Sequence, residues 1–141
     1  MQDDTYPGII QQICKEDPRY DRRAYDFVRL GLDYAAKEMA KRDAERARSS
    51  RHVTGQELSL GLRYYALDQY GPLAKTVLAA WGIQACEDFG EIVYNLIEYG
   101  LLSKTEADKK EDFAGVYTFD EAFVQPYQPV HRRLRPAPET P

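Results

Sequence analysis

The 141-residue sequence is poor in the side chains on which catalytic and metal sites depend. Its two histidines, His52 and His131, each lie beside an arginine, and neither belongs to a spacing typical of a zinc site or a Ser/His/Asp triad. No glycine-rich phosphate loop is present. The sequence therefore gives no catalytic residue, no metal ligand and no cofactor, and it favours a protein that is not an enzyme.

Cysteine is almost absent as well. Cys14 and Cys86 lack a C-x-x-C spacing, so they form neither a disulfide framework nor a zinc site. We expect two buried or half-buried side chains in a reducing compartment. Cys86 is placed to begin a helix, where the helix dipole lowers a thiol pKa, but the neighbouring Glu87 and Asp88 act in the opposite direction.

Long apolar runs are missing too. No stretch is long enough to cross a bilayer, and the N-terminal MQDDTYPGII has acidic residues where a secretory signal has a basic start and an apolar core. We therefore expect a cytoplasmic protein without membrane contact. A hydrophobic content of 43% with 30% charged residues fits one globular domain, which we place at residues 6–124.

Apolar residues recur at three- and four-residue steps through most of the chain, which predicts a mainly α fold. Pro7 is placed to start the first helix, and Asp17-Pro18 ends it. Thr54-Gly-Gln-Glu57 forms a capping box at the start of a later helix. The predicted helices cover residues 6–14, 21–48, 54–70, 73–81 and 86–99.

The pattern changes after Gly100. Leu101–Lys104 and Val116–Phe119 are short and rich in β-forming residues, and a charged run at 105–112 separates them, so we interpret them as a C-terminal β-hairpin. Helices followed by a hairpin are the order of a winged helix-turn-helix. The expected fold class is a helical bundle with a C-terminal hairpin, winged-helix-like. Residues 125–141 are rich in proline and arginine and are expected to form an extended or disordered tail.

The predicted helix at 86–99 carries an acidic outer face. Its outward positions are Glu87, Asp88, Glu91, Asn95 and Glu98. A helix that reads DNA presents basic and polar side chains, because phosphate neutralisation dominates affinity, so this face is not expected to bind nucleic acid. We predict that it contacts a protein partner, in a non-enzymatic interaction or regulatory module. A carboxylate-based active site or cation site at Glu87, Asp88 and Glu91 stays open as an alternative.

Basic residues gather at the end of the long predicted helix. A possible polyanion-binding set there comprises Lys41, Arg42, Arg46, Arg48 and Arg51, and the arginines of the tail add to it. This set supports the alternative function, association with nucleic acid or the ribosome. The simpler interpretation of such a mixed-charge helix end is a solvated face.

Glycines and tyrosines occupy positions that affect packing. Gly31, Gly61 and Gly90 lie inside predicted helices, where each costs about 1 kcal/mol relative to alanine, so they predict close helix–helix approach. Alternatively, Gly90 opens a groove for the backbone of a partner. The eleven tyrosines either edge the core or mark an interface.

The chain resembles a known family over most of the predicted domain. The shared motifs are His52-Val-Thr-Gly-Gln-Glu-Leu, Gly71-Pro-Leu-Ala, Trp81-Gly-Ile, Glu87-Asp-Phe-Gly-Glu-Ile-Val-Tyr-Asn-Leu-Ile, Gly100-Leu-Leu and Glu111-Asp-Phe. On these motifs the chain is similar to an uncharacterised protein family found mainly in Planctomycetes and Verrucomicrobia. That family has no assigned activity, cofactor or catalytic residue, so the resemblance implies only a bacterial, cytoplasmic, stand-alone domain.

Overall fold

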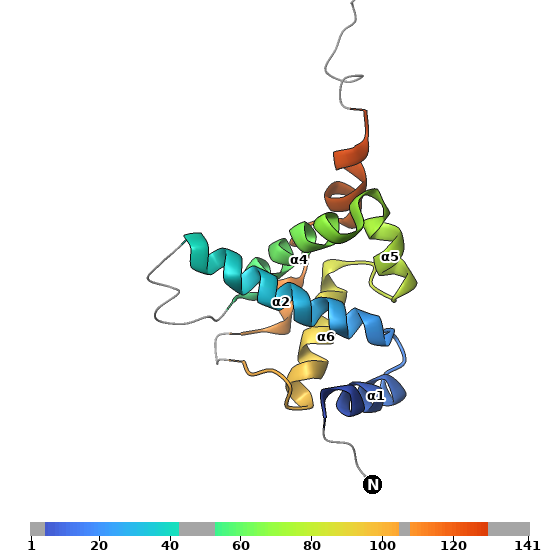
Figure 1. Cartoon of the computed structure of the whole chain (residues 1–141), viewed down its shortest axis with the longest axis vertical. Coiled ribbons are helices and arrows are strands. Elements are labelled where there is room, and N and C mark those ends of the chain that lie inside the picture. Colours follow the sequence, from blue (N-terminus) through green and yellow to red (C-terminus); the bar gives the residue numbers. More distant parts are fainter. Residues whose placement is uncertain (1–4, 43–52, 105–107, 130–141) are drawn as a thin grey trace, which may run out of the picture.

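Helices form most of the structure. The computed structural model describes residues 5–42, 53–104 and 108–129, and no β-strand occurs within these ranges. Figure 1 shows α2 lying across the body, with α1 beyond one edge and the C-terminal turns at the opposite end. The α-helices described are α1 (Tyr6–Glu16), α2 (Arg22–Arg42), α4 (Gly55–Tyr70), α5 (Ala74–Ala80) and α6 (Cys86–Glu98). Short helical turns join or follow them: η1 (Gly71–Leu73), η2 (Lys110–Phe113), η3 (Asp120–Val124) and η4 (Gln125–Tyr127).

The first helix starts at the predicted residue and extends two residues past the predicted end at residue 14, up to the Asp17-Pro18 break. Pro7 lies in its first turn, and Ile10 and Ile13 are fully buried. Asp17 leaves helical geometry at φ −135°, directly before Pro18. The residue types at both ends of α1 are therefore enough to set its limits.

The second helix buries Phe27 and Val28, together with Ala24 and Ala35, against the rest of the body. It is described as far as Arg42, and residues 43–48 of the longer predicted helix lie outside the described residues. The capping box at the start of α4 is confirmed. The Glu57 amide donates to Thr54 Oγ1 across 3.1 Å, and the Thr54 amide donates to Glu57 Oε1 across 3.0 Å.

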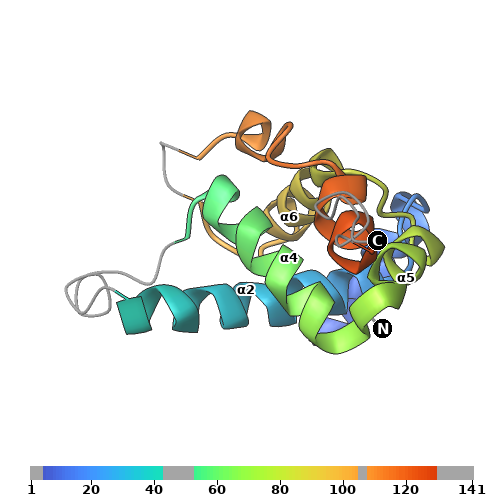
Figure 2. The ribbon, with the colours of Figure 1, turned by 90° about the horizontal axis from the view of Figure 1, so that it is seen from above.

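The two longest described helices, α2 and α4, cross at glycines (Figure 2). A Cβ atom on Gly61 would lie 2.6 Å from the Cβ of Ala35, and one on Gly31 would lie 2.1 Å from Leu62 Cδ2. Both separations are shorter than real Cβ contacts, so neither helix has room for a side chain at its glycine. The predicted close approach of helices is confirmed at these two positions.

Aromatic rings fill the core beside this crossing. The ring of Trp81 lies 5.8 Å from that of Phe27 and 5.7 Å from that of Tyr70, measured between centroids. Trp81 is buried, and so are the phenylalanines of α6 and η3, Phe89 and Phe123. These contacts join α2, the end of α4 and the turn after α5 into one core.

The predicted C-terminal hairpin is wrong, and so is the winged-helix-like fold class. Its first strand is predicted at Leu101–Lys104, yet the backbone amides of Leu101 and Leu102 both donate to the carbonyl of Leu96, across 2.8 and 3.3 Å. Gly100 adopts φ +80°, the left-handed geometry that commonly ends a helix. The two leucines therefore close α6 and pair with no strand among the described residues.

The segment predicted as the second strand, Val116–Phe119, leads into a helical turn instead. Thr118 Oγ1 accepts from the Glu121 amide across 3.1 Å, and the Thr118 amide donates to Glu121 Oε1 across 3.4 Å, in the manner of a capping box. The rings of Tyr117 and Phe119 stack with centroids 6.1 Å apart. The alternating pattern reflects this aromatic packing and not the pleat of a sheet.

The charged run predicted as a hairpin loop contains a buried residue at its end. Phe113, which closes η2, is 3% exposed. A Cβ atom on Gly55 or on Gly90 would lie 3.1 Å from atoms of Phe113, so both glycines make room for its ring. The alternative that Gly90 opens a groove for a partner is therefore wrong, because a side chain of the same chain occupies the space.

The chain stays helical past the predicted domain boundary at residue 124. Gln125–Tyr127 forms η4, where the sequence predicts an extended or disordered tail. Residues 130–141, the remainder of that predicted tail, lie outside the described residues. None of the described helices combines the length and the apolar character that a bilayer-spanning segment needs.

Candidate functional site

Asp88, one of the five residues predicted to contact a partner, caps its own helix. Its Oδ2 atom accepts from the amides of Gln84 and Ala85 across 2.8 and 3.1 Å. Its Oδ1 atom accepts from the hydroxyl of Tyr20, 2.5 Å away. Because Tyr20 is only 3% exposed, this carboxylate links the start of α6 to the core.

Glu91 lies between two basic side chains. Its Oε1 atom is 3.3 Å from Arg19 Nη2 and 3.3 Å from Lys110 Nζ. Arg19 precedes α2 and Lys110 belongs to η2, so the carboxylate bridges two segments that flank α6. Basic side chains from other segments of the same chain therefore lie beside the acidic face of α6.

Asn95 is also engaged within the chain. Its Nδ2 atom donates to Asp17 Oδ2 across 3.0 Å and to the Tyr25 hydroxyl across 2.9 Å. Hydrogen bonds from Arg19, and after them the one from Asn95, hold the pKa of Asp17 well below its usual range despite partial burial. The group fastens the turn between α1 and α2 to α6.

Glu87 and Glu98, the remaining two of the five, are exposed on α6. Binding of a protein partner by this face stays a prediction. Of the five residues predicted to point outward, only Glu87 and Glu98 are exposed. Within residues 5–42, 53–104 and 108–129, no three histidine, cysteine, aspartate or glutamate side chains gather as metal ligands would.

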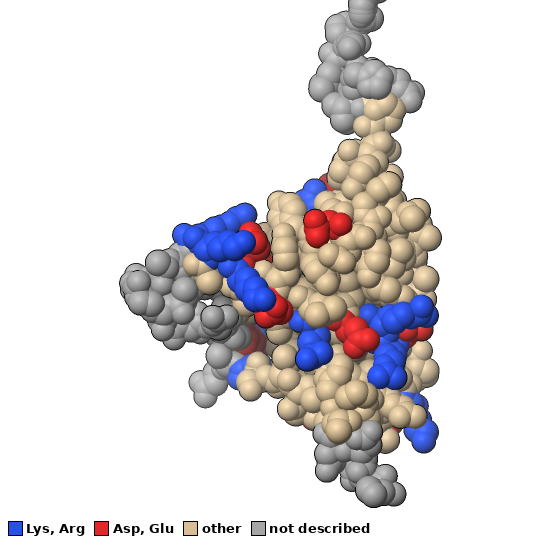
Figure 3. Space-filling view, in the orientation of Figure 1, with Lys and Arg blue, Asp and Glu red and all other residues tan. Residues whose placement is uncertain are grey.

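The basic set at the end of α2 is only partly described. Lys41 Nζ lies 3.3 Å from Glu38 Oε2, and Arg42 ends the helix with an exposed side chain. Figure 3 shows Lys and Arg gathered over this end of α2, with acidic atoms between them and the rest of the face. The other three members of the set, Arg46, Arg48 and Arg51, lie outside the described residues. Binding of a polyanion at this end stays a prediction.

The cysteines are placed as predicted, Cys86 buried and Cys14 half-buried, and neither is in a disulfide. Burial raises the pKa of the Cys86 thiol, and its Sγ donates weakly to the Tyr117 carbonyl across 3.3 Å. Burial also raises the pKa of Cys14. A raised pKa keeps a thiol protonated at neutral pH, which lowers its nucleophilicity.

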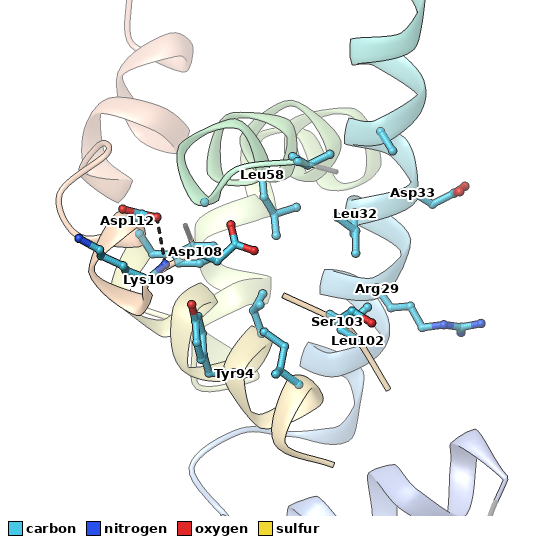
Figure 4. A pocket seen from close by; sticks show the side chains of 16 residues that line it. Arg29, Leu32, Asp33, Leu58, Tyr94, Leu102, Ser103, Asp108, Lys109 and Asp112 are labelled. Atoms are coloured by element: carbon cyan, nitrogen blue, oxygen red, sulfur yellow. Dashed lines mark hydrogen bonds between the residues drawn. The ribbon is translucent and has the colours of Figure 1, made fainter. Parts of the chain in front are cut away.

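A concave site that the sequence did not predict lies between α2, α4, α6 and the chain around η2. It is a pocket of about 320 Å³, a volume at the small end of the range typical of ligand sites. Figure 4 shows Leu32 of α2 and Leu58 of α4 pointing into it. Its apolar walls comprise Leu32, Leu58, Val93, Ile97, Leu102 and Phe113.

One polar group inside this pocket is buried without a partner. The hydroxyl of Tyr94 is inaccessible to solvent and makes no hydrogen bond to the described residues. Burial raises the pKa of this hydroxyl, and the negative charges of Asp108, Asp112 and Glu111 raise it further. The group is therefore protonated at neutral pH.

The charged residues around the pocket are arranged unevenly. The Asp108 carboxylate points into the pocket, whereas Lys109 and Arg29 extend away from it (Figure 4). The Arg29 guanidinium lies 4.2 Å from the centroid of the Tyr6 ring, on the outer side of α2. Asp112 accepts from the Lys109 amide across 3.2 Å and so begins η2. The charged residues of the lining are Asp33, Asp108 and Asp112 together with Arg29 and Lys109.

The lining of the pocket has the composition of an apolar binding site. No cysteine or histidine is found among its described lining residues, and its walls are mainly aliphatic and aromatic. An apolar hollow with a few directed polar groups is typical of a site that accepts an apolar side chain and orients it through one or two hydrogen bonds.

Comparisons of the chain with family models, with curated proteins and with solved structures give no match. The family resemblance therefore stays a prediction from the sequence motifs.

Proposed function

We propose that the protein is a non-enzymatic binding module of the bacterial cytoplasm, and that it takes an apolar side chain of a protein partner into the pocket between α2, α4 and α6. The observation that carries the proposal is the apolar pocket itself, whose walls are mainly leucine, isoleucine, valine and phenylalanine side chains. A partner side chain that fills such a hollow removes these walls from water, which favours binding.

The size of the pocket supports an anchor residue as its occupant. A volume of about 320 Å³ accommodates one large apolar side chain with part of its backbone. Full burial of a leucine or phenylalanine side chain contributes about 1.5–3 kcal/mol, and the adjoining backbone adds hydrogen bonds at the polar edge. A short segment with a single anchor is expected to bind with a Kd of roughly 10–100 µM, since ordering the segment opposes binding.

The proposal replaces the acidic face of α6 as the main contact surface. Asp88 and Asn95 are held by buried or half-buried hydrogen bonds within the chain, so displacing them would weaken the packing around α6, and Glu91 is paired with two basic side chains of the same chain. The pocket needs no such rearrangement. Glu87 and Glu98 stay exposed and can contribute contacts outside the pocket.

Selection from a library of random twelve-residue peptides tests this function. We expect the selected peptides to share one large apolar residue and to bind the full chain in a fluorescence anisotropy titration. The variant Ala36→Trp places an indole in the pocket, because Ala36 belongs to its lining, and should weaken binding at least tenfold.

The matched control is Ala79→Trp, which makes the same change at an exposed position of α5. It should leave the affinity of the peptides unchanged. Selected peptides that bind both variants as tightly as the wild-type chain would show that the pocket is not the binding site. The same anisotropy titration with labelled DNA and RNA at low salt separates this function from the nucleic-acid alternative, which predicts binding that falls steeply with salt.

A further inference from the structure

We propose that residues 130–141, the arginine-rich segment of the chain, bind in a second groove of the same molecule, between α2 and α4, with Leu134 as the apolar anchor. This groove has a volume of about 440 Å³. It shares no lining residue with the pocket of the proposed function. The inference therefore goes beyond that function, and either one can hold without the other.

The groove follows the crossing of α2 and α4, which Figure 2 shows. Gly61 and Ala35, which meet at this crossing, both line it. Two large side chains of α4 are exposed in it, Leu60 at 42% and Tyr64 at 52%, and α2 adds Met39. An apolar side chain bound here would cover surface that α4 leaves in contact with water.

The lining of the groove carries more negative than positive charge. Its charged residues are Glu38, Glu57 and Asp68 together with Arg42. Glu57 is engaged in the capping box of α4, and Glu38 is in a surface ion pair. Asp68 is exposed near the C-terminal end of α4, where it accepts from its neighbour Gln69 across 3.2 Å. It is therefore the carboxylate best placed for a basic side chain that enters from that end.

The arginine-rich segment has the complementary chemistry. It contains Arg132, Arg133 and Arg135, and Leu134 lies between the last two. Its one acidic residue, Glu139, comes later in the sequence. Residues 132–135 therefore combine positive charge with a large apolar side chain, which suits an apolar groove with a carboxylate at one end.

The spacing of the two partners also matches. In an extended segment, side chains two residues apart point to the same side and lie about 7 Å apart, so Arg132 and Leu134 can face the groove together. Asp68 and Tyr64 are one turn apart on α4, about 6 Å along its axis. A segment that runs antiparallel to α4 thus places Arg132 at Asp68 when Leu134 lies beside Tyr64.

The described part of the chain ends close to the groove. The Tyr127 hydroxyl lies 3.8 Å from the position that a Cβ atom on Gly71 would take, and Gly71 caps α4. Figure 1 shows the C-terminal turns beside this end of α4. From Gly71 back to Leu60, α4 runs about 16 Å, whereas the chain from Tyr127 to Leu134 can span about 23 Å. The segment is therefore long enough to reach Leu60.

Attachment to the same chain compensates for a weak contact. A segment with one apolar anchor and one exposed ion pair is expected to bind with a Kd of roughly 0.1–1 mM. A short flexible connection gives an effective concentration of about 1 mM. The groove should therefore be occupied in about half to nine-tenths of the molecules.

NMR of the full chain, with leucine and methionine methyl groups labelled, tests the inference. In the wild-type chain, the Leu134 methyl groups should show nuclear Overhauser contacts with the Leu60 methyl groups and the Tyr64 ring. Leu60→Gln changes an exposed side chain and should remove the contact with Tyr64. Urea unfolding followed by Trp81 fluorescence should be close to that of the wild-type chain, which verifies the fold.

Variants of the arginine-rich segment provide the matched control. Leu134→Gln should shift the methyl resonances of Leu60 and Met39, because it empties the groove. Ala137→Gln makes a change to the same residue type outside 132–135 and should leave these resonances unshifted. Arg132→Gln should weaken docking about two- to fivefold, and added salt should act in the same direction.

The outcomes decide between occupants of the groove. Leu60 and Met39 resonances that do not respond to Leu134→Gln overturn the inference. Contacts of Leu134 that disappear on dilution also overturn it, because the groove would then hold the segment of a second copy. Contacts of Leu134 with Leu102 overturn it too, since they would place the segment in the other pocket. The peptide titrations with Ala36→Trp test the proposed function separately, because Ala36 does not line the groove.

Discussion

Replacement of Asp88 by alanine tests whether this residue supports the fold or faces a partner. The carboxylate accepts three hydrogen bonds, from the amides of Gln84 and Ala85 and from the Tyr20 hydroxyl. A residue that only contacts a partner would change stability little when it is truncated. The structure predicts a large loss instead.

The size of the loss follows from the two roles of the carboxylate. Removal of a helix cap costs about 1 kcal/mol. The Tyr20 hydroxyl, on a side chain that is 3% exposed, is left without a partner, which costs a further 1–3 kcal/mol or so. We therefore expect Asp88→Ala to lower the free energy of unfolding by about 2–4 kcal/mol and the Tm by about 10 °C.

Urea unfolding followed by fluorescence measures this loss, since Trp81 is the single tryptophan and is buried. Glu87→Ala is the control, because its side chain is exposed one position earlier on the same helix; it should cost less than about 1 kcal/mol. In a Tyr20→Phe background, Asp88→Ala should cost only about 1 kcal/mol, the value of the cap alone. Equal stability of Asp88→Ala and Glu87→Ala would refute the reasoning and return Asp88 to the partner-binding residues.

Two further predictions concern the packing and the charges of the helical body. Gly61→Ala should lower the free energy of unfolding by about 1 kcal/mol, because overpacking against Ala35 costs about 1–3 kcal/mol and the gain in helix propensity is about 1 kcal/mol. A urea titration measures this loss. Ala35→Gly should destabilise the Gly61→Ala variant less than it destabilises the wild-type chain. Hydrogen bonds from Arg19 depress the pKa of Asp17 in the folded state, so the stability that Asp17 contributes is present above its unfolded pKa of about 4 and is lost as the pH falls. Asp17→Asn should therefore flatten the decrease of the urea midpoint between about pH 5 and pH 2, and an unchanged slope would contradict that role.

The helices could be predicted from the sequence because their signals are local. Pro7, the pair Thr54 and Glu57, and Gly100 each act within one turn of the helix end they define. The apolar spacing then gives the buried face of each helix directly. Close helix packing at Gly31 and Gly61 could be predicted because a glycine inside a helix carries an energetic cost that is visible in the sequence, whereas the helix packed against each glycine could not.

The C-terminal region could not be predicted because its contacts are not local. Tyr117 and Phe119 alternate as they would in a strand, but the residues they pack on lie in α4, α6 and η3. Thr118 and Glu121 were a capping signal hidden inside this β-like run. Phe113 ended a run of charged residues and gave no sign that it is buried against two distant glycines.

The candidate site depends on the same long-range contacts. Charge spacing alone placed Glu91 on an acidic face, whereas its partner Arg19 is 72 residues away in the sequence. The pocket combines side chains from α2, α4 and α6 with the segment around η2, so no single stretch of sequence describes it.

Methyl-resolved NMR of the full chain, labelled at isoleucine, leucine and valine methyl groups, tests most directly that partners bind in the pocket. Titration with a selected peptide should shift the methyl resonances of Leu58, Val93 and Leu102 and produce contacts between them and the peptide anchor. Leu73, which is 62% exposed on η1, should stay unshifted. Shifts at Leu73 or at other exposed methyl groups, with the three pocket residues unaffected, would contradict the account.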